Sequence, residues 1–200
     1  PHQSHDGKFV MVHNGVIENF GTLKRFLEGK GMSFSSETDS EVLCNLIAYH
    51  YSELPEDEDR FIDAVRLALA KCRGAYGIAV LCLDSPDMMI GARRGSPLVV
   101  GLGDDANFIA SDASAFVGRA KEAVFLNDGE LAILEKGDFR ITTLEGQDAQ
   151  AVTHPLDQVF EEVELGDFDS YMEKEIFEQP TALENTLRGR FGDDGTTAKL

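Results

Sequence analysis

The spacing of apolar residues changes near residue 72, and this change predicts two kinds of structure. Between residues 18 and 72, apolar side chains recur at helical spacing. From residue 75 to residue 145, short apolar or alternating runs are separated by turn residues, which is typical of strands. This segregation predicts an α+β fold, with helices packed on the faces of a mainly antiparallel sheet.

The predicted helices have sequence signals at their ends. The first covers residues 19–28 and is followed by glycines, which commonly end helices. The second follows Thr38 or Asp39, either of which is a natural N-cap, and Glu41 strengthens that start. The third covers residues 60–71, where apolar side chains form a helical stripe.

One apolar run before the first helix is the first candidate for a functional site. Residues 8–12 predict a buried strand, which we expect to end at His13-Asn14-Gly15 and to lead into the first helix. The side-chain amide of Asn14 and the N–H of Gly15 can converge on one oxygen as an oxyanion hole, where one donor contributes roughly 3 kcal/mol. The alternative is an ordinary Asn-Gly turn, because this pair is common in tight hairpins.

Glu37-Thr38-Asp39 is the second candidate. At the start of a helix, these residues are either a cap or a site for a cationic group, such as the ammonium of an amino acid. Nothing in the local sequence decides between the two interpretations.

Turn residues divide the strand-rich part into short strands and predict two hairpins. One hairpin has Ser85-Pro86-Asp87 as its turn, and the other has Asn127-Asp128-Gly129. Residues 139–144 alternate between apolar and polar and predict an edge strand. Other short segments complete this part: strands at 97–102 and 107–111 and a capped helical turn at 111–116.

A change in composition divides the chain into two parts. Residues 1–146 have the pattern of one domain, whereas residues 147–200 are acidic and irregular and predict a linker towards a further domain. Within this linker, residues 169–190 have a helical pattern that Pro180 interrupts. The chain opens on Pro1 and enters a strand within a few residues, so we expect that its true beginning is missing.

Charge limits the classes of partner. The chain has 36 acidic and 18 basic residues and a formal net charge of −18. This charge repels phosphate backbones and anionic lipids, so we expect no nucleic acid and no membrane as partners. No apolar run approaches the ~18 residues that a membrane span needs.

The cysteines and histidines do not form a recognisable reactive or metal-binding pattern. Three cysteines lie in apolar patterns: Cys44, Cys72 and Cys82. Their odd number predicts reduced, buried thiols in a cytoplasmic protein, and their aliphatic neighbours make them poor nucleophiles. No ligand set lies at metal-binding spacing near His2, His5 or His13. Phosphate-loop and dinucleotide fingerprints are absent from the sequence, so no metal and no cofactor is expected.

Several segments together resemble one enzyme family. They resemble, in order, the glutaminase domain of glutamine–fructose-6-phosphate aminotransferase, a class II glutamine amidotransferase. A later segment, residues 171–180, resembles the part that joins this domain to a sugar-isomerase domain. The resemblance spans nearly the whole chain. The segments that carry it are residues 12–19, 36–41, 73–77, 95–101 and 108–112.

The resemblance implies a fold, a reaction and a set of site residues. The fold is an N-terminal-nucleophile hydrolase αββα sandwich, here incomplete at its N-terminus. The reaction is hydrolysis of the glutamine side-chain amide, with transfer of the ammonia to fructose 6-phosphate to give glucosamine 6-phosphate and glutamate. Asn14 and Gly15 would form the oxyanion hole, Asp39 would bind the ammonium of glutamine, and His13 would support the strand end.

Two parts of the family pattern have no counterpart in this chain. The family uses an N-terminal cysteine as nucleophile, and an Arg-Trp element grips the carboxylate of glutamine. Both precede the stretch that matches Pro1, so we expect no glutaminase activity from this chain alone. The family also implies a cytoplasmic enzyme of hexosamine biosynthesis, in which the whole protein forms a homodimer through the sugar-isomerase domain of the same chain.

Two other functions stay open on the sequence. The first is the glutaminase domain of another class II amidotransferase, such as amidophosphoribosyltransferase, which the 171–180 segment disfavours. The second is a non-catalytic glutamine-binding module that has lost its nucleophile.

Overall fold

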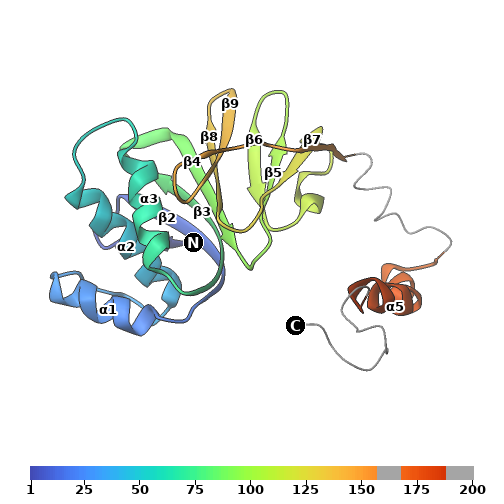
Figure 1. Cartoon of the computed structure of the whole chain (residues 1–200), viewed down its shortest axis with the longest axis horizontal. Coiled ribbons are helices and arrows are strands. Elements are labelled where there is room, and N and C mark those ends of the chain that lie inside the picture. The colour runs from blue at the N-terminus through green and yellow to red at the C-terminus, as the bar shows by residue number, and fades with distance from the viewer. Residues whose placement is uncertain (157–167, 188–200) are drawn as a thin grey trace. The chain divides into compact units, whose positions relative to one another are not determined.

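The chain divides into two compact units. A computed structural model describes residues 1–156 and 168–187 (Figure 1). The units are Pro1–Val159 and Phe160–Leu200. The first holds two β-sheets and the helices α1, α2 and α3, and the second holds helix α5.

The two sheets of the described chain are antiparallel. The larger has seven strands in the order β1-β2-β3-β4-β8-β9-β10, and the smaller has four in the order β11-β7-β5-β6. The strands are β1 (His2–Gln3), β2 (Phe9–Ile17), β3 (Gly74–Cys82), β4 (Ser85–Arg94), β5 (Val99–Leu102), β6 (Asn107–Ala110), β7 (Glu122–Phe125), β8 (Glu130–Glu135), β9 (Asp138–Thr143), β10 (Asp148–Ala149) and β11 (Thr153–Pro155). The mixed α+β class predicted from the sequence is confirmed.

The predicted helices are confirmed, and α1 and α3 begin and end within one residue of the expected positions. They are α1 (Phe20–Gly29), α2 (Asp39–Glu53), α3 (Arg60–Lys71) and α5 (Tyr171–Leu187), and the short 3₁₀ turn η1 (Ala113–Phe116) replaces the expected helical turn. Thr38, one of the two predicted candidates, is the N-cap of α2, and Asp39 is the first residue of the helix. Helix α5 continues through Pro180, so the predicted break there is wrong. The predicted end of this last helix, at residue 190, lies outside the described residues.

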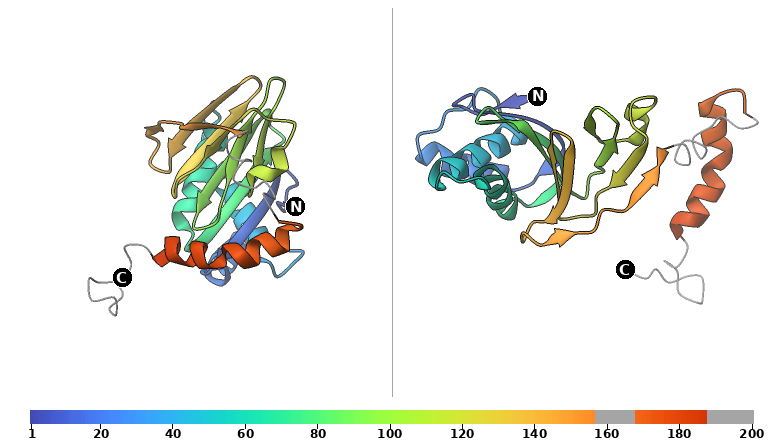
Figure 2. Two further views of the ribbon diagram at one scale, coloured as in Figure 1. Left: turned by 90° about the vertical axis from the view of Figure 1, so that its right-hand side faces the viewer. Right: turned by 90° about the horizontal axis from the view of Figure 1, so that it is seen from above.

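The seven-stranded sheet lies between the helices and the smaller sheet (Figure 2). One hydrophobic core joins α1, α2 and α3 to one face of the larger sheet. A second, smaller core lies between the two sheets and includes Val100, Val124, Leu134 and Ile141. Helix α2 is buried on most of its circumference because it packs against α1, α3 and the sheet. The described part of the first unit is therefore a helix–sheet–sheet arrangement.

Strand β2 runs past Asn14-Gly15, so the prediction that it ends there is wrong. It pairs with β3 through to Ile17, with Asn14 opposite Gly77 and Gly15 opposite Tyr76. Along β2, more buried and less buried residues alternate as far as Asn14, but Asn14, Gly15 and Val16 are all exposed. Helix α1 begins only after Ile17. The Asn-Gly pair is thus neither a hairpin turn nor a strand end, because continuous pairing with β3 keeps the chain extended.

The two predicted hairpins have different outcomes. Strands β3 and β4 do form a hairpin, but its turn is Leu83-Asp84, since β4 already begins at Ser85. The second prediction is wrong, because β7 and β8 lie in different sheets. Between them, Asp128 Oδ1 lies 3.0 Å from Arg93 Nη2, an ion pair that holds the connection as it crosses from one sheet to the other.

Residues after 146 contribute to both sheets. Strand β10 pairs with β9, and β11 pairs with β7. The compact unit therefore extends beyond the boundary that composition suggested, and β9, the predicted edge strand, is covered by β10. The parts of the predicted linker at 157–167 and 188–200 lie outside the described residues.

Candidate functional site

The candidate site lies where β2 passes the N-terminus of α2. Asp39, the first residue of α2, accepts a hydrogen bond at Oδ2 from the backbone N–H of Ile17, over 2.8 Å. The next residue, Ser40, has its Oγ 2.9 Å from Nδ1 of His13. The Asn-Gly pair lies between these two contact points on β2. The fold therefore brings the predicted site residues together from segments that are far apart in the sequence.

Asn14 presents an unused side-chain amide. Its side chain is exposed and makes no hydrogen bond to any residue that the structure describes. Because side chains alternate along a strand, Asn14 lies on the face of β2 opposite Met11 and the helices, together with the exposed Val12 and Val16. An exposed amide without a protein partner is available to a ligand.

Gly15 has a conformation that no other residue would adopt without strain. Its φ is +124°, and a Cβ at this position would lie 2.2 Å from the carbonyl oxygen of Ala75 on β3. The same Cβ would lie 3.0 Å from Oγ of Ser96. The absence of a side chain thus lets the backbone of β3 and the hydroxyl of Ser96 approach the Asn-Gly pair.

Ser96 is a neighbour of the site that reasoning from the sequence missed. Its hydroxyl lies against Gly15 and makes no hydrogen bond within the described chain. Gly77 allows this approach, because a Cβ there would lie 3.0 Å from the carbonyl oxygen of Pro97. The available signal was a glycine on each of the two strands, but only the folded chain shows that Ser96 lies close to both glycines.

His13 is a half-buried contact between β2 and α2. Burial lowers its pKa, and the charge of Asp39 opposes this effect only in part. The neutral form is therefore favoured at neutral pH, and His13 does not place a positive charge beside Asp39. This arrangement leaves the Asp39 carboxylate available to another cation.

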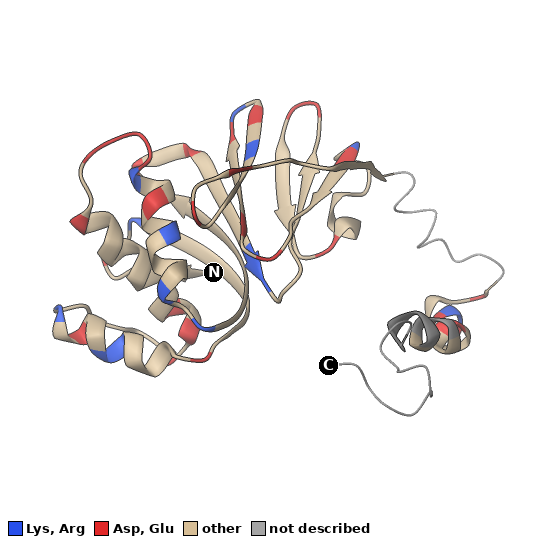
Figure 3. Cartoon of the chain, in the orientation of Figure 1, with Lys and Arg blue, Asp and Glu red and all other residues tan. Residues whose placement is uncertain are grey.

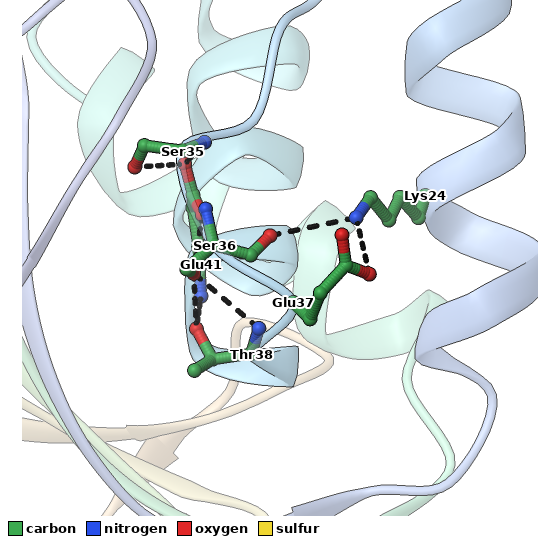
Figure 4. A network of polar contacts seen from close by, with 6 residues as sticks. All are labelled: Lys24, Ser35, Ser36, Glu37, Thr38 and Glu41. Carbon is green, nitrogen blue, oxygen red and sulfur yellow. Dashed lines mark hydrogen bonds and ion pairs between the residues drawn. The ribbon is translucent and has the colours of Figure 1, made fainter.

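A buried carboxylate holds the loop before α2 (Figure 4). Oε1 of Glu41 accepts hydrogen bonds from the N–H and hydroxyl of Ser35, over 2.7 and 2.9 Å. Oε2 accepts from the N–H and hydroxyl of Ser36, over 2.6 and 2.5 Å. Burial raises the pKa of Glu41, but these hydrogen bonds together outweigh it and bring that pKa below its ordinary value. Glu41 is therefore ionised under neutral conditions.

The cap of α2 departs from the common pattern. Thr38 Oγ1 accepts a hydrogen bond from the N–H of Glu41, over 3.3 Å. In a capping box the Glu41 carboxylate would bond back to the N–H of Thr38. Here that N–H donates to Oγ of Ser36 instead, and the carboxylate is left to bind the loop.

Lys24 of α1 holds the same loop from the other side (Figure 4). Its Nζ lies 2.9 Å from Oε2 of Glu37 and 3.4 Å from the carbonyl oxygen of Ser36. The Glu37 side chain is 93% exposed, so solvent weakens this ion pair. Lys24 thus neutralises Glu37 and leaves Asp39 without a cationic partner among the described residues.

The cysteines are reduced and buried, as predicted. Burial raises the pKa of Cys44 and of Cys72 to about 12, and it also raises the pKa of Cys82. A thiol with a raised pKa carries little thiolate at neutral pH, and the thiolate is the nucleophilic form. None of these thiols is therefore a nucleophile for the site.

Wider features of the described chain add no second candidate. Acidic residues occur on the helices and on loops of both sheets, so they are not confined to one element (Figure 3). Within residues 1–156 and 168–187, no group of three or more His, Cys, Asp or Glu side chains is placed to hold a metal ion. No helix in these ranges is long and apolar enough to cross a membrane.

Comparison with known proteins places the chain in a family. The glutamine amidotransferase domain family matches residues 1–118, a range that includes every residue of the candidate site. The chain belongs to this family. Its mixed α+β fold with antiparallel sheets is similar to the glutaminase domains of class II amidotransferases.

Two curated relatives of this amidotransferase domain carry the same name. Glutamine–fructose-6-phosphate aminotransferase (isomerizing) of Chlorobaculum tepidum is 43% identical over 190 residues, which are 95% of this chain and 31% of that protein. The enzyme of that name from Thermus thermophilus is 42% identical over 200 residues, which are 100% of this chain and 32% of that protein. The chain spans about a third of the length of these relatives.

A solved structure also resembles the amidotransferase domain. It is the glutamine phosphoribosylpyrophosphate amidotransferase from B. subtilis, complexed with ADP and GMP. The TM-score is 0.58 and the identity 26%, over 71% of this chain and 30% of that one. The identity is lower than that of the curated relatives, although the fold is shared.

Proposed function

We propose that this chain is the glutamine-hydrolysing part of an enzyme that transfers the amide nitrogen of glutamine to fructose 6-phosphate. The products are glucosamine 6-phosphate and glutamate, which makes this an enzyme of hexosamine biosynthesis. The observation that carries the proposal is the 42–43% identity to two enzymes named for this reaction, over 95–100% of the chain.

The proposed glutamine lies along the part of β2 beyond Met11, where the pairing with β1 has ended. Its ammonium is bound by Asp39, and the carbonyl oxygen of its side-chain amide is met by Asn14 and Gly15. Asp39 bonds to Ile17, which is two residues, or about 7 Å, beyond Gly15 on an extended strand. Extended glutamine spans a similar distance between its ammonium and its amide oxygen, so one molecule can reach both groups.

The proposed chemistry needs donors that act on the transition state. When a thiolate attacks the amide carbon, a C–S bond forms and the carbonyl oxygen becomes negative. The Asn14 amide and the Gly15 N–H stabilise this charge. The C–N bond then breaks, ammonia leaves with an added proton, and water hydrolyses the thioester to glutamate. His13, which favours its neutral form, supports the strand and is not the base.

The nucleophile of this reaction is not among the cysteines of the chain. All three are buried, and burial disfavours their thiolates. We therefore propose that these 200 residues alone do not hydrolyse glutamine. The site supplies substrate binding and the oxyanion hole, and a thiolate must be supplied to it.

The same proposal extends to the organisation of the enzyme. The part of the chain beyond the first compact unit leads towards a sugar-isomerase domain. The glutaminase domain is an N-terminal-nucleophile αββα sandwich, and the whole enzyme is a cytoplasmic homodimer. The greater length of the curated relatives and the reduced cysteines support this organisation. It needs no cofactor.

A second candidate is the glutaminase domain of an amidophosphoribosyltransferase. The structural similarity to the B. subtilis enzyme favours it. Its identity of 26%, against 42–43% for the aminotransferases, ranks it second.

A domain exchange tests the proposal. The matching 200 residues of the Thermus thermophilus enzyme are replaced by this chain, with Asn14→Ala in the same hybrid as the inactive control. We expect glutamine-dependent formation of glucosamine 6-phosphate, with about one molecule formed per glutamate released. Glutamate release without glucosamine 6-phosphate would favour the second candidate. A hybrid that unfolds cooperatively, binds glutamine and releases no glutamate would indicate a non-catalytic module instead.

A further inference from the structure

Glu41 is a buried carboxylate without a cation. Its residue is 4% exposed, and none of the described Lys, Arg or His side chains forms an ion pair with it. Burial of a carboxylate is unfavourable unless hydrogen bonds compensate. Here the compensation is four donors from two consecutive residues, Ser35 and Ser36. The Glu41 carboxylate can accept these four hydrogen bonds only when the loop at Ser35 and Ser36 has this conformation, so it stabilises that conformation.

The loop that Glu41 holds leads directly to Asp39. Glu41 lies two residues after Asp39 in the first turn of α2, and Thr38 caps that turn immediately before it. Asp39 thus lies, along the chain, between the capping residue and the anchored carboxylate. On the far side, Ser40 contacts His13 of β2. The first turn of α2 cannot unwind without breaking these contacts.

We propose that Glu41 is the positioning residue for Asp39. By tying Ser35 and Ser36 to the first turn of α2, it holds the Asp39 carboxylate against the edge of β2, where Asp39 meets the N–H of Ile17. This inference rests on the proposed function only in taking Asp39 as the ammonium site. Glu41 itself does not touch the substrate.

The donor pattern makes Glu41→Gln a specific probe. Each carboxylate oxygen of Glu41 accepts two hydrogen bonds. One of the two comes from a backbone N–H, which can only donate and cannot become an acceptor. Glutamine has nearly the same shape but only one acceptor oxygen, so its NH₂ must face either the Ser35 or the Ser36 donors. The variant therefore keeps the packing and removes the anchor on one side of the loop.

Amide hydrogen exchange of the 200-residue chain tests the positioning directly. Glu41→Gln should raise the exchange rate of the Ile17 amide about tenfold or more, because loss of the hydrogen bonds on one side of the loop favours local opening. Asp39→Ala, which removes the acceptor itself, gives the reference for complete loss. Glu56→Gln is the control, since Glu56 is also a helix-proximal acid but its side chain is 92% exposed. The Ile78 amide on β3 reports global unfolding.

Two results would overturn the proposal. The first is an unchanged Ile17 exchange rate in Glu41→Gln. The second is an equal increase for Ile17 and Ile78, which would show general destabilisation without positioning. If Glu41→Gln does not fold, Ser35→Ala removes one hydroxyl donor and leaves the others, and about a threefold increase confined to Ile17 is then expected.

The hybrid enzyme described above links the positioning to the substrate. Glu41→Gln should raise the glutamine concentration needed for half-saturation about tenfold. It should leave the binding of 5-amino-5-oxopentanoate, which lacks the ammonium, unchanged. Equal losses for both compounds would contradict the link. If the hybrid binds no glutamine, the proposed function fails, while the exchange of Ile17 still decides whether Glu41 positions Asp39.

Discussion

The two ends of the β2–β3 ladder differ in how their polar groups are used. At the end near Lys8, Nζ lies 2.7 Å from Oδ2 of Asp84, and Tyr51 donates its hydroxyl to the same oxygen over 3.2 Å. The guanidinium carbon of Arg60 lies 4.1 Å from the centre of the Tyr51 ring. The charged and polar groups at this end therefore interact mainly with one another.

At the other end, near Asn14, several polar side chains lack a protein partner among the described residues. Asn14 and Ser96 make no hydrogen bond within the described chain, and Asp39 has no cationic partner there. At Gly15 the backbones of β2 and β3 approach so closely that no side chain fits between them. The comparison shows that the polar side chains beside this strand pair bond to one another at one end and have no protein partner at the other. Donors already bonded within the protein are not available to a ligand, so only the second end suits the proposed site.

Gly15→Ala, at the end of the β2–β3 ladder near Asn14, should have the largest effect on stability. The added Cβ would meet the carbonyl oxygen of Ala75 at 2.2 Å, in a backbone conformation with φ +124°. Strain and overpacking together should lower the free energy of unfolding by about 3 kcal/mol or more. Gly31→Ala is the matched control: φ is +86° but a Cβ there has nothing within 4 Å, so a loss of about 1 kcal/mol is expected. Urea denaturation measures both, and equal losses would contradict the collision.

Asn14→Ala should separate function from stability. The exposed amide has no protein partner among the described residues, so the free energy of unfolding should change by less than about 0.5 kcal/mol. In the hybrid enzyme, loss of one oxyanion donor should lower the rate of glutamate release by about 10²–10³-fold. Stopped assays of glutamate and urea denaturation of the same preparation measure the two quantities. A large loss of stability with little loss of rate would show that Asn14 has a structural role and is not an oxyanion donor.

The pH dependence of stability should reveal Glu41. Its pKa in the folded chain lies below that of the unfolded chain, about 4.3, so the unfolded chain binds a proton more readily. The contribution of Glu41 is thus present above about pH 4.3 and is lost as the pH falls through the folded pKa. At pH 7, Glu41→Gln should lower the free energy of unfolding by about 1–3 kcal/mol. The difference between variant and wild type should shrink on acidification, and a constant difference would contradict the argument.

Asp84→Asn, at the end near Lys8, should have the smallest effect. The Lys8 and Asp84 side chains are each 43% exposed, so water and salt screen their attraction. Melting curves at low and high salt should show a small loss at low salt that disappears at high salt. Glutamate release by the hybrid should be unchanged, since this pair lies at the opposite end of the ladder from Asn14. A reduced rate would show that the two ends are coupled.

Local signals in the sequence were sufficient for the helices and for part of the site. Thr38 caps α2 as expected, because a cap and its helix are neighbours in the chain. The prediction that Asn127-Asp128-Gly129 makes a hairpin was wrong, although the signal is strong. Such a triplet specifies a change of direction but not the sheet that receives the next strand. That choice depends on distant residues, such as Arg93, which pairs with Asp128.

The sequence by itself determined the α+β class, the boundaries of α1 and α3, the reduced state of the cysteines and the family motifs around Asn14 and Asp39. These properties depend on periodicity, caps and residue type, all of which are local. Only the tertiary structure decided that β2 continues beyond Gly15, that Ser96 lies against it and that Glu41 anchors the loop before Asp39. Each of these depends on hydrogen bonds or close approach between atoms that the fold brings together, and a local pattern cannot specify the partner.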